Sequence, residues 1–265
     1  MFKTGVITAN YVHEINGFQA APWGELVEQH RQRFGPAQLD ALLGRIAAMG
    51  FTHVELWLVH VGNCGVDPLW ATTTPADVLA LFATHGLALA ALCVGGIGSQ
   101  TELDPLFEYA RALGAPMLTG WLGREPALWA KLAGYLERHD TRYGIEPHGP
   151  TYSLTTPDEM LAAMAVSPRL GACPDTGVWA RHDIDPTAGL APLARRMIHM
   201  HLKGYHRGDD RDCAPGADDI GLDRFLRAAR DAGYGGVYSL EYEADHNSDA
   251  ELTRARRWVI ETLSR

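Results

Sequence analysis

Residues 36–58, PAQLDALLGRIAAMGFTHVELWL, contain the unit that decides the fold of this chain. Residues 36–49 repeat apolar side chains at helical spacing, and the proline at the start suits a first helical turn. Gly50 follows at the point where a left-handed residue would end the helix. Residues 52–58 then alternate in the manner of a strand. The stretch therefore predicts a helix, a glycine stop and a β-strand.

The same unit recurs along the chain. Three more helical stretches end at Gly86, Gly114 and Gly233, and an apolar run follows each of them. The predicted strands are residues 3–9, 52–58, 87–94, 115–119, 143–147, 170–174, 197–203 and 236–241. Helical stretches separate them, near residues 36–49, 74–86, 101–113, 125–139, 157–166, 186–195 and 220–232, and residues 249–263 supply the last helix. Alternating strands and helices in eight units predict an α/β fold, a closed (β/α)8 TIM barrel.

The alternative to a barrel is a doubly wound open sheet. Such a sheet usually has a glycine-rich phosphate turn after its first strand. Here the first strand leads into TANYVH, residues 8–13, which has no GxGxxG pattern. No change of composition marks a linker, so we expect residues 1–265 to form a single barrel domain.

Composition and charge limit the partners that we expect. The chain is 46% hydrophobic and 21% charged, which is ordinary for a globular protein. A net charge of −9 without any basic run argues against a nucleic-acid partner. Cys64, Cys93, Cys173 and Cys213 form no CxxC pair, which favours a reducing compartment over a disulfide framework. No apolar stretch approaches the ~20 residues of a membrane span, so we expect a cytoplasmic protein without a membrane partner.

Ionisable residues follow four consecutive predicted strands. The segments are IEPH (145–148), CPDTG (173–177), HMHLK (199–203) and SLEYE (239–243). Because α/β barrels keep their chemistry at the carboxyl ends of the strands, four side chains should converge at the barrel mouth. These are Glu146, Asp175, His201 and Glu241.

Three carboxylates and an imidazole in an apolar cup would repel one another unless a cation lay among them. Each residue alone is typical of a solvent-facing loop, but four together after apolar strands favour a metal site. A set rich in oxygen ligands favours one divalent ion, Mn²⁺, Mg²⁺ or Co²⁺, over a cysteine-rich zinc site.

The same four segments carry a family resemblance. In their order and spacing they resemble the metal-binding segments of the sugar phosphate isomerase/epimerase-like barrels, the xylose isomerase-like TIM barrels of the AP-endonuclease family 2 superfamily. The likeness extends to GFTHVELW (50–57) and GLALAALCV (86–94) and covers nearly the whole chain. It implies that the quartet binds the metal, and that Arg207 lies near bound substrate.

Three positions depart from the pattern of this family. Val178 stands where many relatives have a histidine, and Tyr152 stands where ketose epimerases have a further glutamate. Gly204 replaces an aspartate that often follows the lysine of the seventh strand. The first two changes remove polar contacts to substrate, which weakens the likeness to ketose epimerases in particular.

Further residues near the predicted mouth have two interpretations each. Lys203 shares a strand face with His201 and either polarises a substrate oxygen or pairs with a carboxylate. His148 is a candidate for proton transfer or for support of the site, and His199, deeper on its strand, fits a hydrogen-bonded core histidine better. Aromatic residues at strand ends either stack on a sugar or only pack: Trp57, Trp121, Trp179 and His13 are the candidates for substrate binding.

The reaction that this set favours is metal-assisted proton transfer next to a carbonyl. A metal chelating a carbonyl and its neighbouring hydroxyl would stabilise an enediolate. Glu146 and Glu241 flank the arc of ligands, so one can remove a proton and the other can return it. The sequence therefore predicts an isomerase or epimerase of a sugar or small keto or hydroxy compound.

Three other functions stay open at this point. If the substrate carries a β-hydroxyl, the same intermediate gives a dehydratase or lyase acting on a keto-inositol or keto-sugar. A nuclease of the AP-endonuclease type needs further histidines. His60 is one weak candidate, strand 3 ends in CVGG (93–96), and Val178 fills the third such position. A catalytically silent sugar-binding barrel is the third. The oligomeric state, a homo-oligomer included, is not determined by the sequence.

Overall fold

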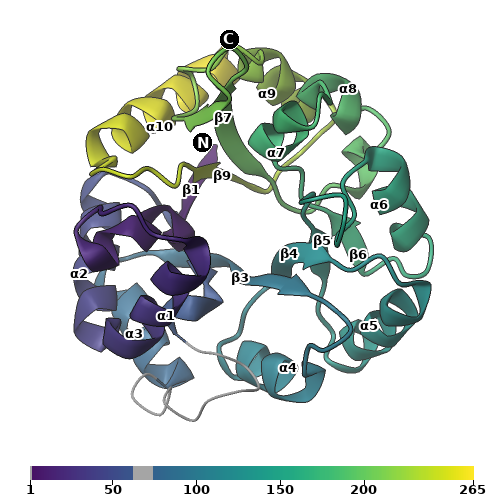
Figure 1. Ribbon diagram of the computed structural model, residues 1–265, viewed down its shortest axis with the longest axis horizontal. Helices are drawn as coiled ribbons and strands as arrows, with labels where there is room; N and C mark the ends of the chain where they lie inside the picture. The colour runs from purple at the N-terminus through teal and green to yellow at the C-terminus, as the bar shows by residue number, and fades with distance from the viewer. Residues whose placement is uncertain (1, 62–73) are drawn as a thin grey trace.

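Eight parallel strands form a barrel inside a ring of helices (Figure 1). The structure is a computed structural model and describes residues 2–61 and 74–265. Neighbouring strands follow the order of the chain, and β1 also pairs with the last strand. The barrel strands are β1 (Lys3–Ile7), β2 (His53–Trp57), β3 (Ala88–Ile97), β4 (Leu118–Leu122), β5 (Tyr143–Ile145), β6 (Leu170–Ala172), β7 (His201–His206) and β9 (Val237–Glu241).

The barrel closes between β6 and β7. Two parallel bridges join these segments, Ala172 with Met197 and Asp175 with His201. The His201 amide donates a hydrogen bond to the Pro174 carbonyl oxygen at 2.8 Å. The predicted TIM barrel is therefore confirmed.

The outer helices alternate with the strands. They are α2 (Pro36–Ala48), α3 (Pro75–Thr84), α4 (Leu103–Ala112), α5 (Pro126–Arg138), α6 (Pro157–Met164), α8 (Pro186–Leu190), α9 (Leu222–Asp231) and α10 (Asp249–Ser264). Their apolar stripes pack on the outside of the barrel and bury the main hydrophobic core. The order of colours around the ring in Figure 1 shows that consecutive units are neighbours.

Local signals start and stop these helices as the sequence predicts. Gly50, Gly86, Gly114 and Gly233 all have φ between +63° and +85°, the left-handed conformation that ends a helix. Helix starts also follow the predicted signals. Helix α3 begins with Pro75, directly after Thr74, and the Thr74 hydroxyl accepts a hydrogen bond from the Asp77 amide. The repeated unit of the sequence is therefore the repeated unit of the fold.

Several boundaries differ from the prediction. Strand β7 begins at His201 instead of residue 197 and runs on to His206, where it forms a hairpin with β8 (Arg211–Cys213). Helix α8 ends at Leu190, and a short 3-10 turn, η4 (Ala194–Arg196), completes the stretch predicted as a longer helix. These segments have short apolar runs whose pairing depends on neighbours far along the chain.

Two α-helices and a 3-10 segment that the sequence did not predict lie at the mouth of the barrel in the described chain. The 3-10 segment η1 (Thr8–Asn16) and helix α1 (Trp23–Arg33) follow β1. Helix α7 (Thr176–Arg181) follows β6 directly and has only six residues. Their sequences are short or mainly polar, so the helical period is weak.

Two expectations about the chain as a whole concern membranes and cysteines. No helix in the described ranges is long and apolar enough to cross a membrane. Cys93, Cys173 and Cys213 are free and buried, whereas Cys64 lies outside the described residues.

Candidate metal centre and pocket

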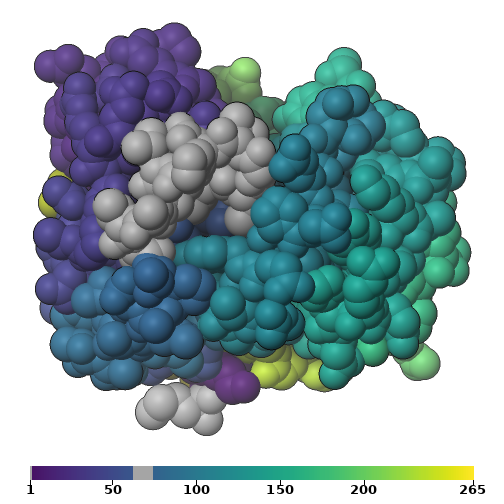
Figure 2. Space-filling view, turned by 90° about the horizontal axis from the view of Figure 1, so that it is seen from below, coloured from purple at the N-terminus to yellow at the C-terminus, as the bar shows by residue number. Residues whose placement is uncertain are grey.

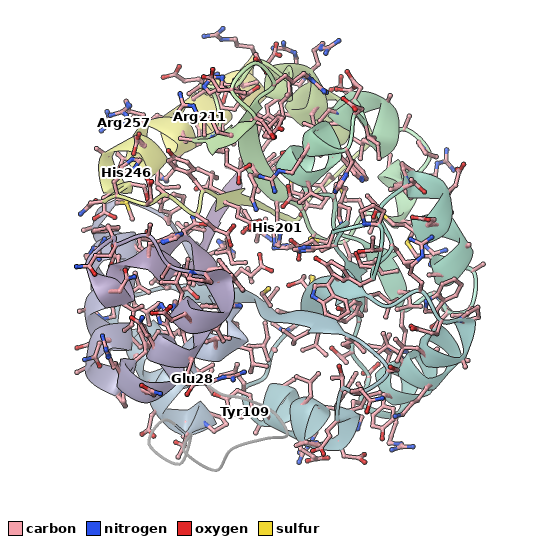
Figure 3. All side chains as sticks on the ribbon, in the orientation of Figure 1. Glu28, Tyr109, His201, Arg211, His246 and Arg257 are labelled. Carbon is pink, nitrogen blue, oxygen red and sulfur yellow. The ribbon has the colours of Figure 1, made fainter. Side chains whose placement is uncertain are left out.

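The four residues at the predicted strand ends converge at the mouth of the barrel. One ligand atom from each of them lies within 4.8 Å of the corresponding atoms of the other three, and all four residues are buried. Figure 3 shows His201 near the centre of the ring of helices. The residues are Glu146, Asp175, His201 and Glu241.

Asp175 is fixed by the start of α7. Its Oδ1 atom accepts a hydrogen bond of 2.9 Å from the Val178 amide and so caps the helix. Its Oδ2 atom is buried and has no hydrogen-bond partner within the described part of the chain. The ammonium of Lys203 lies 3.4 Å from this oxygen and offsets part of its charge. A buried carboxylate oxygen without a hydrogen-bond partner is still costly, and its position beside three other ligand groups suits a metal cation.

Glu241 has a second oxygen of this kind. Its Oε2 atom lies 2.9 Å from Nδ1 of His201, but the two atoms lack hydrogen-bonding geometry, and this oxygen has no other partner among the described residues. Nδ1 of His201 also lies 3.1 Å from Oε1 of Glu146. These donors form a compact set of oxygens around one nitrogen, and the set fits a divalent ion.

Glu55 holds the other side of the His201 ring. This residue of β2 is fully buried inside the barrel, and its Oε2 atom lies 2.8 Å from Nε2 of His201 and 2.7 Å from Nε2 of His199. Ser239 donates to the same oxygen at 3.1 Å, and Thr119 donates to the other one. With Nε2 bonded to Glu55, Nδ1 faces the ligand set.

Sequence reasoning did not include Glu55 in the site. The available signal was a carboxylate at an inward position of an apolar strand, in THVELWL. The interpretation of His199 as a hydrogen-bonded core histidine is confirmed by its bond to Glu55. Glu55, His199 and His201 also form a second group with metal-ligand spacing, but hydrogen bonds already join their polar atoms.

The ionisable groups of the site shift one another's pKa values. Burial by itself would raise the pKa of Glu146, but His201 and His148 beside it hold that pKa well below its ordinary value. Burial lowers the pKa of His148, and Glu146, 3.2 Å away, more than offsets this and raises it. The carboxylate of Glu146 is therefore ionised at neutral pH, as a ligand or base must be.

Lys203 reaches the same mouth from β7. Its Nζ atom lies 2.8 Å from Oε1 of Glu241, and 3.4 Å from both Oδ2 of Asp175 and Oε2 of Glu243. Burial opposes the charge of this ammonium, yet the three carboxylates raise its pKa well above the ordinary value. Of its two interpretations, pairing with carboxylates is the one that the geometry shows.

A cavity of about 460 Å³ opens above this cluster. Seen from the side in Figure 2, the upper edge of the molecule dips between the purple N-terminal segments and the teal middle of the chain. The described residues that line the cavity are Ile7, Ala9, Trp23, Trp57, Cys93, Gly95, Trp121, Glu146, His148, Tyr152, Lys203, Glu241 and Glu243. Trp57 and Trp121, both candidates for substrate binding, are among them.

The other three candidates for substrate binding are not on the cavity wall. Trp179 is completely buried and donates from its indole nitrogen to the Thr155 carbonyl, so it packs in the core. Arg207 donates from Nη1 to the Ala180 carbonyl at 3.1 Å, because its loop turns outward after β7. His13 lies half-buried in η1. The structure does not bring these three residues to the pocket.

Comparison with protein families identifies the barrel. The family model described as xylose isomerase-like TIM barrel matches residues 43–262. The chain belongs to this family. No curated protein matches the chain significantly.

Several solved enzyme structures have the same fold. An L-ribulose 3-epimerase superposes with a TM-score of 0.73 at 16% identity, over 100% of this chain and 95% of that one. D-psicose 3-epimerase, crystallised in the presence of D-fructose, gives 0.72 at 13% identity with both chains fully covered. The probable 3-DHS dehydratase AsbF of Bacillus anthracis gives 0.69 at 16% identity, over 98% of this chain and 99% of that one. At these identities the likeness establishes the fold.

Proposed function

We propose that this chain is a divalent-metal-dependent isomerase or epimerase of a sugar or a small hydroxy ketone. The observation that carries the proposal is the buried ligand set directly beneath a cavity, with two buried carboxylate oxygens that lack hydrogen-bond partners in the described chain. A cavity of about 460 Å³ suits a small-molecule substrate. Membership of the xylose isomerase-like TIM barrel family and the fold likeness to two sugar epimerases support the same choice.

Glu146, Asp175, His201 and Glu241 would hold the ion, which we expect to be one Mn²⁺, Mg²⁺ or Co²⁺ per chain. When bound there, it supplies Lewis acidity to a substrate carbonyl and the neighbouring hydroxyl, which makes the intervening C–H bond acidic. Asp175 would contribute only Oδ2, because its Oδ1 accepts the hydrogen bond from the Val178 amide at the start of α7.

Glu146 and Glu241 are the proposed proton-transfer residues. They extend from β5 and β9, on either side of His201, and both line the cavity. One carboxylate removes the proton from the substrate carbon, and the other returns a proton to the opposite face or to the neighbouring carbon. His148 lies 3.2 Å from Glu146 and can pass a proton between that carboxylate and the cavity. Lys203 holds Glu241 in place and neutralises part of the local negative charge.

Solvent exchange tests this proposal. With Mn²⁺-loaded protein and a ketose substrate in D₂O, deuterium should enter the carbon next to the carbonyl. Glu146→Gln and Glu241→Gln should each abolish exchange, with a loss of at least about a hundredfold, while the far-UV circular dichroism stays that of the barrel. Glu261→Gln, on the exposed face of α10, is the matched control and should behave as wild type. Wild-type turnover without deuterium incorporation and without an elimination product would exclude the enediolate mechanism.

Dehydration of a keto-inositol or keto-sugar is the second candidate. His148 lines the cavity and is about a third exposed, so it can protonate a hydroxyl that leaves the β-carbon. The fold likeness to a probable dehydratase points the same way. An enone product, detected by its ultraviolet absorbance, together with loss of that product in His148→Gln, would favour elimination over epimerisation.

A further inference from the structure

The cavity has two chemically different halves. Every described lining residue from the first half of the chain is uncharged, and these residues come from β1 to β4, from η1 and from α1. Among the described wall residues, every ionisable acid or base apart from the buried thiol of Cys93 comes from the second half, from β5, β7 and β9 and the segments that follow them. Because the barrel strands stand in chain order, these two sets form two opposing arcs of one mouth.

Aromatic rings cover the uncharged arc. Trp23 of α1 is 46% exposed and lies against Trp57, with ring centres 5.5 Å apart. At the border of this arc, the ring centre of Trp121 lies 5.4 Å from that of Tyr152, which comes from the second half of the chain and is 50% exposed. Only four large hydrophobic side chains in the described ranges are this exposed, and two of them stand at this cavity. Apolar surface concentrated at a pocket indicates a ligand with an apolar face.

The backbone around these rings is built to let them face the cavity. A side chain at Gly96 would collide with the ring of Trp121, and a Cβ atom at Gly149 would lie 2.7 Å from Tyr152. Glycine at both positions therefore lets the rings lie flat over the neighbouring backbone. The rings of Trp23, Trp57, Trp121 and Tyr152 thus line one side of the cavity, which we call the aromatic arc.

Among the described residues of the charged arc, the only lysine or arginine side chain is already paired with carboxylates. Lys203 is the only lysine or arginine among the described residues on the wall, and it already faces Asp175, Glu241 and Glu243. Residues 1 and 62–73, outside the described ranges, include no lysine, arginine or histidine. The carboxylates of the site belong to Glu146, Asp175, Glu241 and Glu243. Together with the Lys203 ammonium and one divalent ion they leave a net negative charge, and a protonated His148 would bring the total only to zero. An anionic substrate would find no unpaired positive charge here.

The place where TIM barrels commonly bind phosphate is acidic in this chain. That place is formed by the loops after the seventh and eighth barrel strands. Here the eighth barrel strand, β9, leads into EYEAD, residues 241–245, with three acidic residues. The loop after the seventh, β7, carries Asp209 and Asp210. Arg207 in that loop bonds to the Ala180 carbonyl, away from the cavity.

We propose that the pocket selects an uncharged hydroxy ketone whose apolar face or end lies on the aromatic arc, and that it rejects phosphorylated and carboxylated sugars. The hydroxy ketone part rests on the function proposed above. The oxygens of the substrate face the charged arc, and the carbon-rich end packs against Trp23, Trp57 and Trp121. The pocket would thus select its substrate by apolar contact at one end and by repulsion of anionic groups at the other.

Three ligands that differ only at C6 test the proposal. D-fructose, 6-deoxy-D-fructose and D-fructose 6-phosphate carry a hydroxyl, a hydrogen and a phosphate there. Binding to Mn²⁺-loaded protein is followed by quenching of tryptophan fluorescence and by calorimetry. We expect 6-deoxy-D-fructose to bind at least as tightly as D-fructose, and the 6-phosphate to bind at least about tenfold more weakly. Tighter binding of the 6-phosphate, or no binding of either neutral ketose at millimolar concentration, overturns the proposal.

Two variants locate the selectivity. Trp23→Ala should weaken binding of both neutral ketoses about threefold to tenfold, and Leu79→Ala, equally exposed on α3 at 43% but outside the cavity, should not. Glu243→Gln should narrow the preference for D-fructose over D-fructose 6-phosphate severalfold, because one like charge is removed. Unchanged affinities in both variants would show that these residues do not select the substrate.

The outcomes separate this inference from the proposed function. Deuterium exchange that prefers D-fructose 6-phosphate would leave the metal-dependent reaction standing and overturn the substrate class. Neutral ketoses that bind with the expected ranking, but never exchange, would leave the selectivity standing and remove the proposed reaction.

Discussion

At the scale of single residues, His201 connects two buried polar groups. Its Nε2 side belongs to the network around Glu55 inside the barrel, and its Nδ1 side belongs to the ligand set at the mouth. A metal-binding histidine commonly donates its other ring N–H to a carboxylate, which fixes the ring and the tautomer. Glu55 is therefore a positioning residue for His201.

Glu55→Gln should weaken metal binding about tenfold to a hundredfold, because the amide removes the charge that holds the His201 ring. Isothermal titration of metal-free protein with Mn²⁺ measures this. Ser239→Ala is the matched control, since it removes a neutral hydrogen bond to the same oxygen and leaves the charge. It should cost about 1 kcal/mol of stability and leave the Mn²⁺ affinity near that of wild type. Equal Mn²⁺ affinity in Glu55→Gln would reduce Glu55 to a structural role.

Metal affinity should also depend on pH. Burial alone would lower the pKa of His201, but Cys173, Glu55, Glu146 and Glu241 raise it well above the ordinary value. The metal-free ring thus keeps a proton at neutral pH, and Nδ1 must lose it to bind a metal. Mn²⁺ affinity should therefore rise with pH, by up to about tenfold per pH unit, until the pH passes the raised pKa. A competition titration with a fluorescent chelator measures this, and a flat profile between about pH 6 and 8 would contradict it.

At the scale of elements, α7 is a short helix of six residues that begins directly after Asp175, a residue of the candidate site. It begins where Asp175 caps it, and it packs against β7 through Gly177. A Cβ atom at residue 177 would lie 2.6 Å from Cγ of Lys203. The glycine therefore allows the helix and the lysine to share one small space.

Gly177→Ala should displace Lys203 or α7 and destabilise the protein by about 1–3 kcal/mol. Catalytic activity should fall with it, since Lys203 contacts Glu241. Gly134→Ala is the control, because Gly134 is an exposed residue of α5 with no atom within 4 Å of the added methyl group. It should stabilise α5 by about 0.5–1 kcal/mol. Chemical denaturation compares the two variants, and equal shifts would contradict the packing argument.

At the scale of the whole molecule, the proposed metal site spans the seam at which the barrel closes. Glu146, Asp175 and His201 come from β5, from the residues after β6, and from β7, and the seam closes between the last two. A ligand that binds only the folded chain stabilises it by mass action. An ion at this position would therefore stabilise the closure of the sheet between β6 and β7.

Chelation should lower the melting temperature. For a metal present at a hundred times its Kd the loss is about 2.7 kcal/mol, or roughly 5–10 °C for a chain of this size. Asp175→Asn is the matched variant, because its amide oxygen can still accept the Val178 hydrogen bond while the free ligand oxygen is replaced. Its melting temperature should not respond to Mn²⁺ or to chelator. A wild-type melting temperature that changes with neither Mn²⁺ nor chelator would argue against a bound metal.

The sequence by itself determined the barrel and the four residues at its mouth. Helix stops such as Gly50 and strands such as residues 52–58 are local signals, since a left-handed glycine or an alternating run acts within a few residues. Once the strands are parallel and in order, their carboxyl ends must meet. The convergence of Glu146, Asp175 and His201 therefore follows from one-dimensional information.

Only the tertiary structure decided which other side chains join the site. Glu55 belongs to it because β2 lies across the barrel from His201, a contact between residues 146 positions apart. Arg207 and Trp179 do not line the pocket, and Trp23 does, because a loop or short helix takes its direction from what it packs against. Such packing has no period along the chain, so the sequence pattern does not contain it.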